Sequence, residues 1–547
     1  MRCLDAAGTV AEAIAFRGET ILAVGARADV LAAAGPDAVL HSLGGATVLP
    51  GFIDAHHHVA LAALYGGLVR LVPPEVRDVA SLQAALRRAS AALPPGRWLV
   101  AMEWDAGLLA ERRAPTRAEL DEAVGDRPLF CLHQTCHSAL ANSRALELAG
   151  IDASTPDPPG GAIERGRGGL PTGLLLERGM SRVEALARPD LAAHDSEGFL
   201  ERVAAHYRAL VAVGITGVAD LACPVDLLPL YREAVRRGHV LVPTQACPVS
   251  ATGYLEEPWD VLQGPRSGET MGPLEVGPVK LVLDGAPGCS MCLGVFQSLA
   301  ALVKTLGLSV ARGSLDPLRT TLSIEPRYGL KLRSGVAIYG AADAERVVRT
   351  LVESGFGVAS HAIGNAAADV ALGAYAAAGD ALHQATLPRI EHGSFLARSQ
   401  VARLADLGAG LAVQPSFLRM PLYEHAVSVP GLPYFPLRWL LDAGVPLAGS
   451  SDYPVFEFDP LRGMRDAVER TNLRGEVVDR AQRLEVSEAL DLYTRGAARV
   501  CGWADRAGSL EVGKRADAVV LEGALEPLEA ARVRATFVGG ALVHGSV

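Results

Sequence analysis

The chain has 547 residues, of which 50% are hydrophobic and 20% are charged, so it can bury a large core and is not a disordered protein. Its formal net charge of −10 makes nucleic acid and anionic membrane surfaces poor partners. The length predicts a large domain with a smaller companion, and 8 cysteines in so long a chain do not form a disulfide framework.

The chain carries no sequence signal for export or for membrane insertion. Residues 1–16 include Arg2, Asp5 and Glu12 and have no uninterrupted apolar core, which does not fit a signal peptide. No later stretch reaches the roughly 20 uncharged apolar residues that a membrane helix needs. We therefore expect a soluble, cytoplasmic protein that has a small-molecule substrate and binds neither nucleic acid nor membrane. The sequence leaves the oligomeric state undecided, and a homo-oligomer is one of the alternatives.

Short strands with tight turns are predicted at both ends of the chain. Residues 15–25 alternate between apolar and polar types around Arg17-Gly18-Glu19, which indicates a hairpin. Further strands are predicted at residues 46–53, at 516–521 and at 535–543, the last with a turn at Gly539-Gly540. Because both ends have this character and lack catalytic residue types, we expect them to form one small sheet domain together.

Between the two ends, apolar runs alternate with helical patterns. The runs are the one ending at Ile53, then 214–220, 239–246, 279–283, 357–361, 387–391, 410–414 and 445–449. Eight repeated strand–helix units predict a parallel sheet closed into a (β/α)8 barrel of the TIM type, an α/β fold. Two long insertions interrupt this alternation of strands and helices, at about residues 64–210 and 286–339. Loops of that length at a barrel's C-terminal face usually form lids or substrate walls.

Three consecutive histidines, His56-His57-His58, follow the first predicted barrel strand directly. In an extended segment, residues i and i+2 point the same way, so the imidazoles of His56 and His58 would face one point and His57 would face elsewhere. The alternative is a polar loop that happens to be rich in histidine. The position at a strand end and the spacing together favour a metal site.

Lys280 lies in the fourth apolar run, which is otherwise apolar on both faces, and only three other lysines occur in the chain. Burial lowers the pKa of an amine. A neutral amine can add carbon dioxide and become a carbamate, whose two oxygens can bridge two metal ions. The alternative is a structural lysine paired with Asp284 or another acid, but the rarity of lysine elsewhere favours the special role.

Three further polar residues end predicted strands. His361 ends the fifth run, His392 follows the sixth, and Asp452 follows the eighth. Taken singly, each is better explained as a satisfied polar residue, or for Asp452 as a helix N-cap. Together with His56 and His58 they predict nitrogen and oxygen ligands for zinc, or for iron or manganese, in a site of one or two ions.

These motifs resemble those of the metal-dependent amidohydrolase superfamily, and most closely those of the branch that includes N-substituted formamide deformylase. The similar segments are Leu49 to His58, Val279 to Gly285, His361 to Gly364, Arg389 to His392, Gly449 to Pro454 and Gly508 to Asp517. The chain departs from the family pattern at Asn365, where aspartate is usual, around Thr135 to Leu140, and in the segment after Gly285. The substrate walls are therefore altered while the metal motifs are intact.

The resemblance implies a β-sandwich domain of residues 1–48 and 506–547, and a barrel domain of residues 49–505. It implies a metal centre of His56, His58, Lys280, His361, His392 and Asp452, with His137 and Glu177 as candidate substrate contacts. The expected reaction is attack of metal-bound hydroxide on a non-peptide C–N bond of an amide, formamide or cyclic amide, with Asp452 passing the proton to the leaving amine. Deamination or ester hydrolysis at the same centre is the alternative reaction. A binding protein that keeps the fold without the chemistry is a further alternative. The loss of a metal ligand would indicate that case, and the sequence has lost none.

Overall fold

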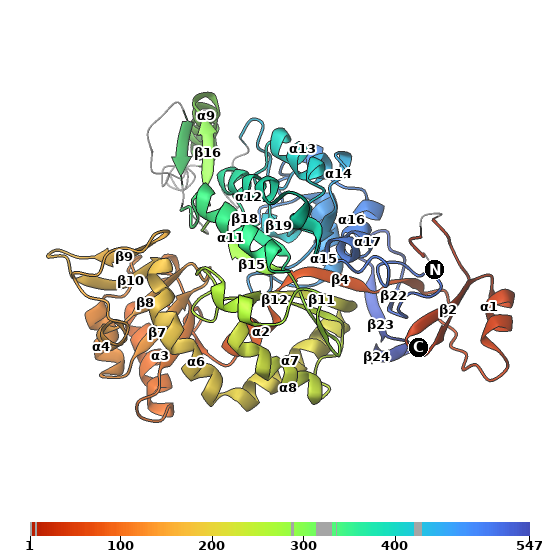
Figure 1. Cartoon of the computed structure of the whole chain (residues 1–547), viewed down its shortest axis with the longest axis horizontal. Helices are drawn as coiled ribbons and strands as arrows, with labels where there is room; N and C mark the ends of the chain where they lie inside the picture. The colour runs from red at the N-terminus through yellow and green to blue at the C-terminus, as the bar shows by residue number, and fades with distance from the viewer. Residues whose placement is uncertain (1–2, 6–7, 286–288, 313–330, 335, 421–428) are drawn as a thin grey trace.

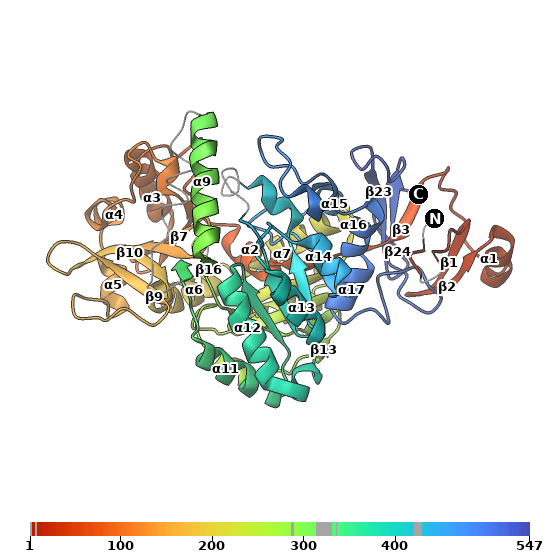
Figure 2. The same cartoon turned by 90° about the horizontal axis from the view of Figure 1, so that it is seen from above.

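The computed structural model describes residues 3–5, 8–285, 289–312, 331–334, 336–420 and 429–547. At its centre stand two sheets made mainly of parallel strands, with helices around them (Figure 1). A mixed sheet from the first insertion lies at one end of the molecule, and small antiparallel sheets lie with both chain termini at the other (Figures 1 and 2). The protein is thus an α/β protein whose centre is flanked by two smaller sheet regions.

The two central sheets have the strand orders β13-β14-β12-β11-β4 and β15-β18-β19-β20-β21. Their strands are β4 (Phe52–His57), β11 (Ile215–Pro224), β12 (Thr244–Val249), β13 (Thr270–Met271), β14 (Leu274–Val276), β15 (Val279–Val282), β18 (Val358–Ala362), β19 (Arg389–His392), β20 (Gly410–Val413) and β21 (Leu447–Gly449). Every neighbouring pair is parallel except β13 and β14. Each of the eight predicted apolar runs overlaps one of these strands.

The first run was predicted as one strand but holds two. Its first part is β3 (Thr47–Pro50), which pairs with β22 near the C-terminus, and its second part begins β4, which pairs with β11. Gly51 separates them, where an added Cβ would lie only 2.0 Å from Oγ1 of Thr216. Only glycine therefore fits at the point where the chain passes from the terminal sheet into the central one.

Backbone hydrogen bonds join the two central sheets at both margins. The N–H of Gly277, just before β15, donates to the carbonyl of Ala246 in β12 at 2.8 Å. On the other side, the N–H of Asp452, just after β21, donates to the carbonyl of His56 in β4, also at 2.8 Å. The carboxyl ends of the first and last central strands therefore lie side by side.

Helices alternate with the central strands, as the sequence predicts. They are α2 (Val59–Tyr65), α6 (Ser181–His194), α7 (Ser196–Ala212), α8 (Leu228–Arg236), α11 (Ala341–Glu353), α12 (Asn365–Ala378), α13 (Arg398–Asp406), α14 (Leu437–Asp442), α15 (Pro460–Glu469), α16 (Val486–Leu492) and α17 (Arg495–Val500). In α11 the buried residues recur at helical spacing, with Val347, Val348, Leu351 and Val352 on one face. That face packs toward the strands because the burial of apolar surface stabilises the pair.

The first insertion contains a sheet of its own, which the sequence did not reveal. Its strand order is β5-β6-β7-β8-β10-β9. The strands are β5 (Val69–Arg70), β6 (Leu99–Trp104), β7 (Leu129–His133), β8 (Ser138–Ala141), β9 (Gly161–Arg165) and β10 (Pro171–Glu177), with helices α3 (Val79–Ala92), α4 (Arg117–Val124) and α5 (Ser143–Leu148). The second insertion holds β16 (Met291–Gly294), α9 (Val295–Arg312) and β17 (Lys331–Ser334), while residues 286–288, 313–330 and 335 of it lie outside the described part.

The two chain ends meet in one antiparallel sheet with the order β24-β23-β22-β3. Its strands after β3 are β22 (Ala518–Glu522), β23 (Arg532–Val538) and β24 (Ala541–Gly545). The predicted hairpin is present as β1 (Ala13–Arg17) and β2 (Thr20–Gly25), followed by α1 (Arg27–Ala34). Among the described residues, none of the helices has the length and apolar character to cross a lipid bilayer.

Candidate metal centre

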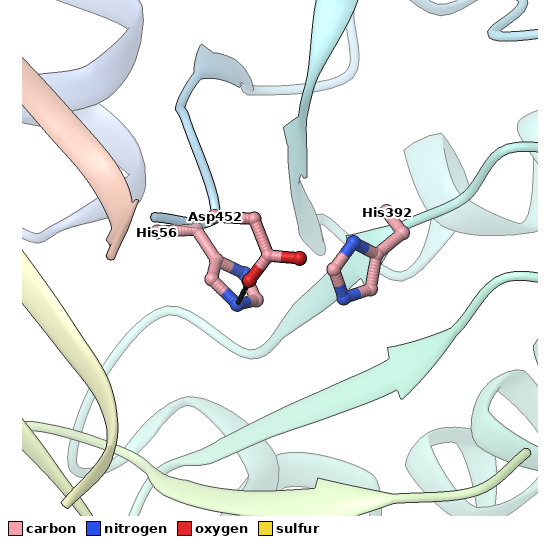
Figure 3. Close-up of side chains that lie close together, drawn as sticks. All are labelled: His56, His392 and Asp452. Atoms are coloured by element: carbon pink, nitrogen blue, oxygen red, sulfur yellow. Dashed lines mark ion pairs between the residues drawn. The ribbon is translucent and has the colours of Figure 1, made fainter. Parts of the chain in front are cut away.

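Three buried side chains from three different strands meet at one point. His56 comes from β4, His392 ends β19 and Asp452 follows β21, and their ligand atoms all lie within 4.8 Å of one another (Figure 3). Nε2 of His56 lies 3.2 Å from Oδ1 of Asp452. The carboxyl ends of the strands thus gather two imidazoles and a carboxylate, three of the six candidate ligands, in one buried cluster.

A buried carboxylate fixes the ring of His56. Nδ1 of His56 donates to Oε2 of Glu391 at 2.5 Å, which leaves Nε2 as the atom that faces the other ligands. Arg389, which is fully buried, donates from Nε to the other oxygen of Glu391 at 2.5 Å. Burial would raise the pKa of Glu391, but the charge of Arg389 holds that pKa well below its usual range. Glu391 is therefore ionised and selects the tautomer of His56 that a metal needs.

The other two histidines of the triplet point in opposite directions, as the alternation of an extended strand predicts. His58 faces the centre: its Nε2 lies 2.8 Å from Oδ1 of Asp452, and its Nδ1 donates to the carbonyl of Leu221 at 2.5 Å. His57 faces away, toward Oδ2 of Asp54 at 3.0 Å and Nε2 of His206 at 2.7 Å. Of the three histidines in this triplet, only His56 and His58 are therefore placed to bind an ion.

His361 and His392 form the opposite side of the pocket, with their ring centroids 4.5 Å apart. Nδ1 of His392 donates to Oε1 of Gln414 at 2.9 Å, so its Nε2 is free for the centre. Nε2 of His361 is buried and has no hydrogen-bond partner within the described residues. A buried polar atom without a partner is costly, and an ion bound there would remove that cost.

Burial keeps these two imidazoles neutral. It lowers the pKa of His392 to about 3, and it lowers the pKa of His361 well below the usual range, with His392 adding to the effect. Neutral imidazole is the form that binds metal. The donor set of nitrogen and carboxylate oxygen, together with the unpartnered Nε2 of His361, fits a divalent cation such as zinc.

Lys280 reaches the same pocket from β15. Its Nζ is buried and lies 3.4 Å from Nε2 of His56, and burial lowers the pKa of the amine. In the part of the chain that the structure describes, no carboxylate lies at ion-pair distance from this nitrogen. Asp284, the partner considered from the sequence, instead accepts backbone N–H groups of Ser290, Ile363 and Gly364 at 2.9–3.0 Å.

His137 and Glu177 of the first insertion also approach the centre. Nδ1 of His137 lies 2.8 Å from Oε2 of Glu177, and the ring of His137 is 5.8 Å from the ring of His361. Glu177 packs against Gly285, where an added Cβ would lie 2.1 Å from its Oε1. The inserted sheet thus places two polar side chains, from β10 and the turn before β8, beside the pocket.

Two of the candidate metal ligands have unusual backbone conformations. Asp452 has φ of 59° and His392 has φ of 74°, both in the left-handed region that non-glycine residues rarely adopt. Such conformations cost of order 1–3 kcal/mol each and persist where the surrounding structure holds them. Their occurrence at two residues of one buried cluster supports a functional role for the cluster.

The sequence reasoning missed the residues that orient the ligands. Glu391, Arg389 and Gln414 were not singled out, although two charged residues inside the buried strand β19 were a signal that could have been read. Their partners lie far away in the sequence, since His56 and Glu391 are 335 residues apart. Such pairings depend on strand neighbours and not on local spacing.

Residues 41–544 of the chain match the amidohydrolase family. The chain belongs to that family. It is 31% identical to N-substituted formamide deformylase of Arthrobacter pascens over 99% of this chain and 96% of that protein. It is 29% identical to the putative amidohydrolase YtcJ of Bacillus subtilis strain 168, over 92% of this chain and 90% of the relative.

The fold has a counterpart among solved structures. An uncharacterised metal-dependent hydrolase from Pyrococcus horikoshii superposes with a TM-score of 0.66 at 22% identity, covering 93% of each chain. Family membership makes the chain a hydrolase that acts on carbon–nitrogen bonds other than peptide bonds.

Proposed function

We propose that this enzyme hydrolyses the C–N bond of an amide, an N-substituted formamide or a cyclic amide at a zinc centre. The observation that carries the proposal is the cluster of His56, His392 and Asp452, whose ligand atoms lie within 4.8 Å of one another at the ends of three strands. The resemblance to a formamide deformylase over nearly the whole of both chains supports this substrate class.

The proposed zinc ligands are His56, His58, His361, His392 and Asp452, with Lys280 as a carbamate. A zinc ion in such a site acts as a Lewis acid and lowers the pKa of bound water to about 7. His58 and His392 are held by Leu221 and Gln414 on the sides away from the pocket, which leaves their Nε2 atoms for the ion. This fixed geometry limits the reorganisation needed when the ion binds.

In this mechanism Asp452 moves the proton. Its carboxylate takes a proton from the attacking water and gives it to the nitrogen of the leaving amine. The neighbouring His56 and His58 keep the carboxylate ionised in the resting state, although burial opposes ionisation. His137 and Glu177 contact the substrate from the inserted sheet and orient its carbonyl group.

Lys280 would determine whether one or two ions are held. Its buried amine can form a bond to the carbon of carbon dioxide and lose a proton, which gives a carbamate with two oxygen ligands. Nζ lies only 3.4 Å from Nε2 of His56, so these oxygens would extend into the pocket between the two sides. One ion would then be shared with His56 and His58, and a second with His361 and His392.

We also propose that eight of the parallel central strands, those that overlap the predicted apolar runs, form one closed (β/α)8 barrel within residues 49–505. The hydrogen bonds from Gly277 to Ala246 and from Asp452 to His56 support closure at both margins. Residues 1–48 and 506–547 would form a composite β-sandwich beside it, since β3 pairs with β22.

The test uses the purified chain with and without a chelator. Hydrolysis of an N-substituted formamide, a simple amide and a cyclic amide is measured beside an ester and an aminated heterocycle as alternative substrates. We expect turnover of at least one of the first three, its loss with chelation, and its return with zinc. Turnover confined to the ester or to deamination, or activity that survives complete removal of metal, would contradict the proposal.

A further inference from the structure

The helix α9 of the second insertion exposes a stripe of large apolar side chains. Figure 2 shows α9 standing clear of the central sheets, and Figure 1 places it at the edge of the molecule. The side chains of this stripe are between 45% and 87% exposed. They are Phe296, Leu299, Val303, Leu306 and Val310, which we call the α9 stripe.

The opposite face of α9 is made of small residues and is buried. Ala301, Thr305 and Ser309 follow one another four residues apart and are at most 8% exposed. The hydroxyl of Thr305 donates to the carbonyl of Ala301 at 2.7 Å. The helix therefore packs on its own chain through its small side, and its large apolar side is left facing solvent. A contiguous exposed apolar patch of this kind marks an interaction surface.

We propose that the α9 stripe packs against the same stripe of a second copy of this chain. Its residues are alternately three and four apart, which is the heptad spacing of helices that pack along a shared seam. Phe296, Val303 and Val310 occupy one heptad position, and Leu299 and Leu306 the other. β-Branched residues, such as Val303 and Val310 at the first position, with leucine at the second favour pairs of helices.

The stripe is large enough for a specific dimer. Each of its side chains can remove about 100 Å² of apolar surface from water. The five of them, with the neighbouring exposed Val295, then give about 600 Å² per copy and about 1,200 Å² in a symmetric pair, which is the lower limit of specific interfaces. Flanking contacts around α9 would add to this area.

The charges of α9 fit a second copy better than a lipid surface. The sequence of the helix contains no aspartate or glutamate. Its two charged residues, Lys304 and Arg312, do not occupy either of the two heptad positions that form the stripe. Two copies would therefore bring no like charges together at the seam. A helix that lies on a membrane usually opposes its apolar face with a solvated basic face. Here the opposite face consists of buried Ala301, Thr305 and Ser309 instead.

The test measures the mass of the full-length chain in solution by sedimentation velocity over a wide micromolar range. We expect the wild type to dimerise and the double variant Leu299→Glu/Val303→Glu to stay monomeric, because the charges would be buried in the seam. The matched control is Val39→Glu/Leu40→Glu, which changes the same residue types at exposed positions, 81% and 65% accessible, far from α9. It should dimerise like the wild type.

A second, milder variant distinguishes loss of the interface from misfolding of the chain. Val303→Ala/Leu306→Ala removes apolar contacts without adding charge and should weaken dimerisation at least 100-fold, with an unchanged circular dichroism spectrum. A wild type that stays monomeric at every concentration, a glutamate variant that still dimerises, or flotation of the wild type with neutral phosphatidylcholine vesicles in place of self-association would overturn the proposal. The result does not depend on which amide the enzyme cleaves.

Discussion

The two sides of the metal pocket are prepared for an ion to different degrees. On the side of β4 and β21, which we call the bonded side, His56, His58 and Asp452 are each held by protein partners: Glu391, the carbonyl of Leu221, and the two histidines themselves. On the open side, His392 is held by Gln414, but Nε2 of His361 has no hydrogen-bond partner within the described residues and lies 3.5 Å from Oδ1 of Asp284. For Nζ of Lys280, also on this side, the one hydrogen-bond-range contact among the described residues is that with Nε2 of His56 at 3.4 Å.

This difference predicts an order of affinity. Ligands that are already oriented lose little freedom when an ion binds, so the bonded side should hold the tighter ion. The open side has a buried nitrogen and a buried amine whose interactions are completed only by a ligand. It should hold the second, weaker ion, and it should depend on the state of Lys280. Substitutions on the two sides should therefore have separable effects on metal content.

The largest effect is expected from the bonded side. His56→Ala removes a ligand that contacts Asp452 and lies beside Lys280, so both sides lose a neighbour. We expect loss of bound metal and a fall in kcat/KM of more than about 100-fold. Metal content by mass spectrometry and turnover measure this, with His41→Ala, an exposed histidine, as the control.

The matching substitution on the open side is His361→Ala. It should lower metal content and turnover as well but should leave the ion of the bonded side in place. Equal loss of metal in His361→Ala and His56→Ala would remove the distinction between the two sides. Unchanged metal content in both would mean that the site lies elsewhere.

The next largest effect concerns Lys280 and decides how many ions act. Lys280→Ala should lose one ion and most activity, and formate or acetate in the buffer should restore part of both, because a small carboxylate can take the place of the carbamate. Lys304→Ala, an exposed lysine on α9, is the control and should change neither. An active, metal-loaded enzyme whose intact mass shows an unmodified Lys280 would argue for a single-ion mechanism.

A smaller effect is expected from the group behind His56. Glu391→Gln keeps the size of the side chain but removes the charge that fixes the tautomer of His56 and pairs with Arg389. The dissociation constant for zinc should rise about 10–100-fold, as for other outer-sphere partners of metal ligands. Competition with a chelating dye measures it. An unchanged zinc affinity in a folded Glu391→Gln variant would show that Glu391 has no positioning role.

How much of this could be predicted from the sequence depended on the range of the interactions. The central strands are buried on both faces, so each appears as a continuous apolar run, and the ligands His56, His361, His392 and Asp452 stand at or just after the ends of such runs. The inserted six-stranded sheet was missed although its strands are as long as the central ones, because their partners are set by tertiary packing. The Glu391–His56 contact was missed because it joins residues 335 positions apart.

The smallest effect is expected outside the metal ligands, at the wall of the pocket. Glu177 comes from β10 of the inserted sheet and contacts His137, whose ring faces His361 on the open side. Glu177→Gln should therefore leave metal content unchanged and raise KM about tenfold, the value of roughly one hydrogen bond. Glu164→Gln, an exposed glutamate on the neighbouring strand β9, is the matched control and should not change KM.

A change in KM without a change in metal content is the result that identifies a substrate contact. A residue that only supports the open side would change the occupancy of the second ion, because His137 stands between Glu177 and His361. A residue that contacts substrate would change KM at constant occupancy. If Glu177→Gln lowers metal content together with kcat, the inserted sheet belongs to the metal site, and the open side would be a surface completed from two parts of the chain.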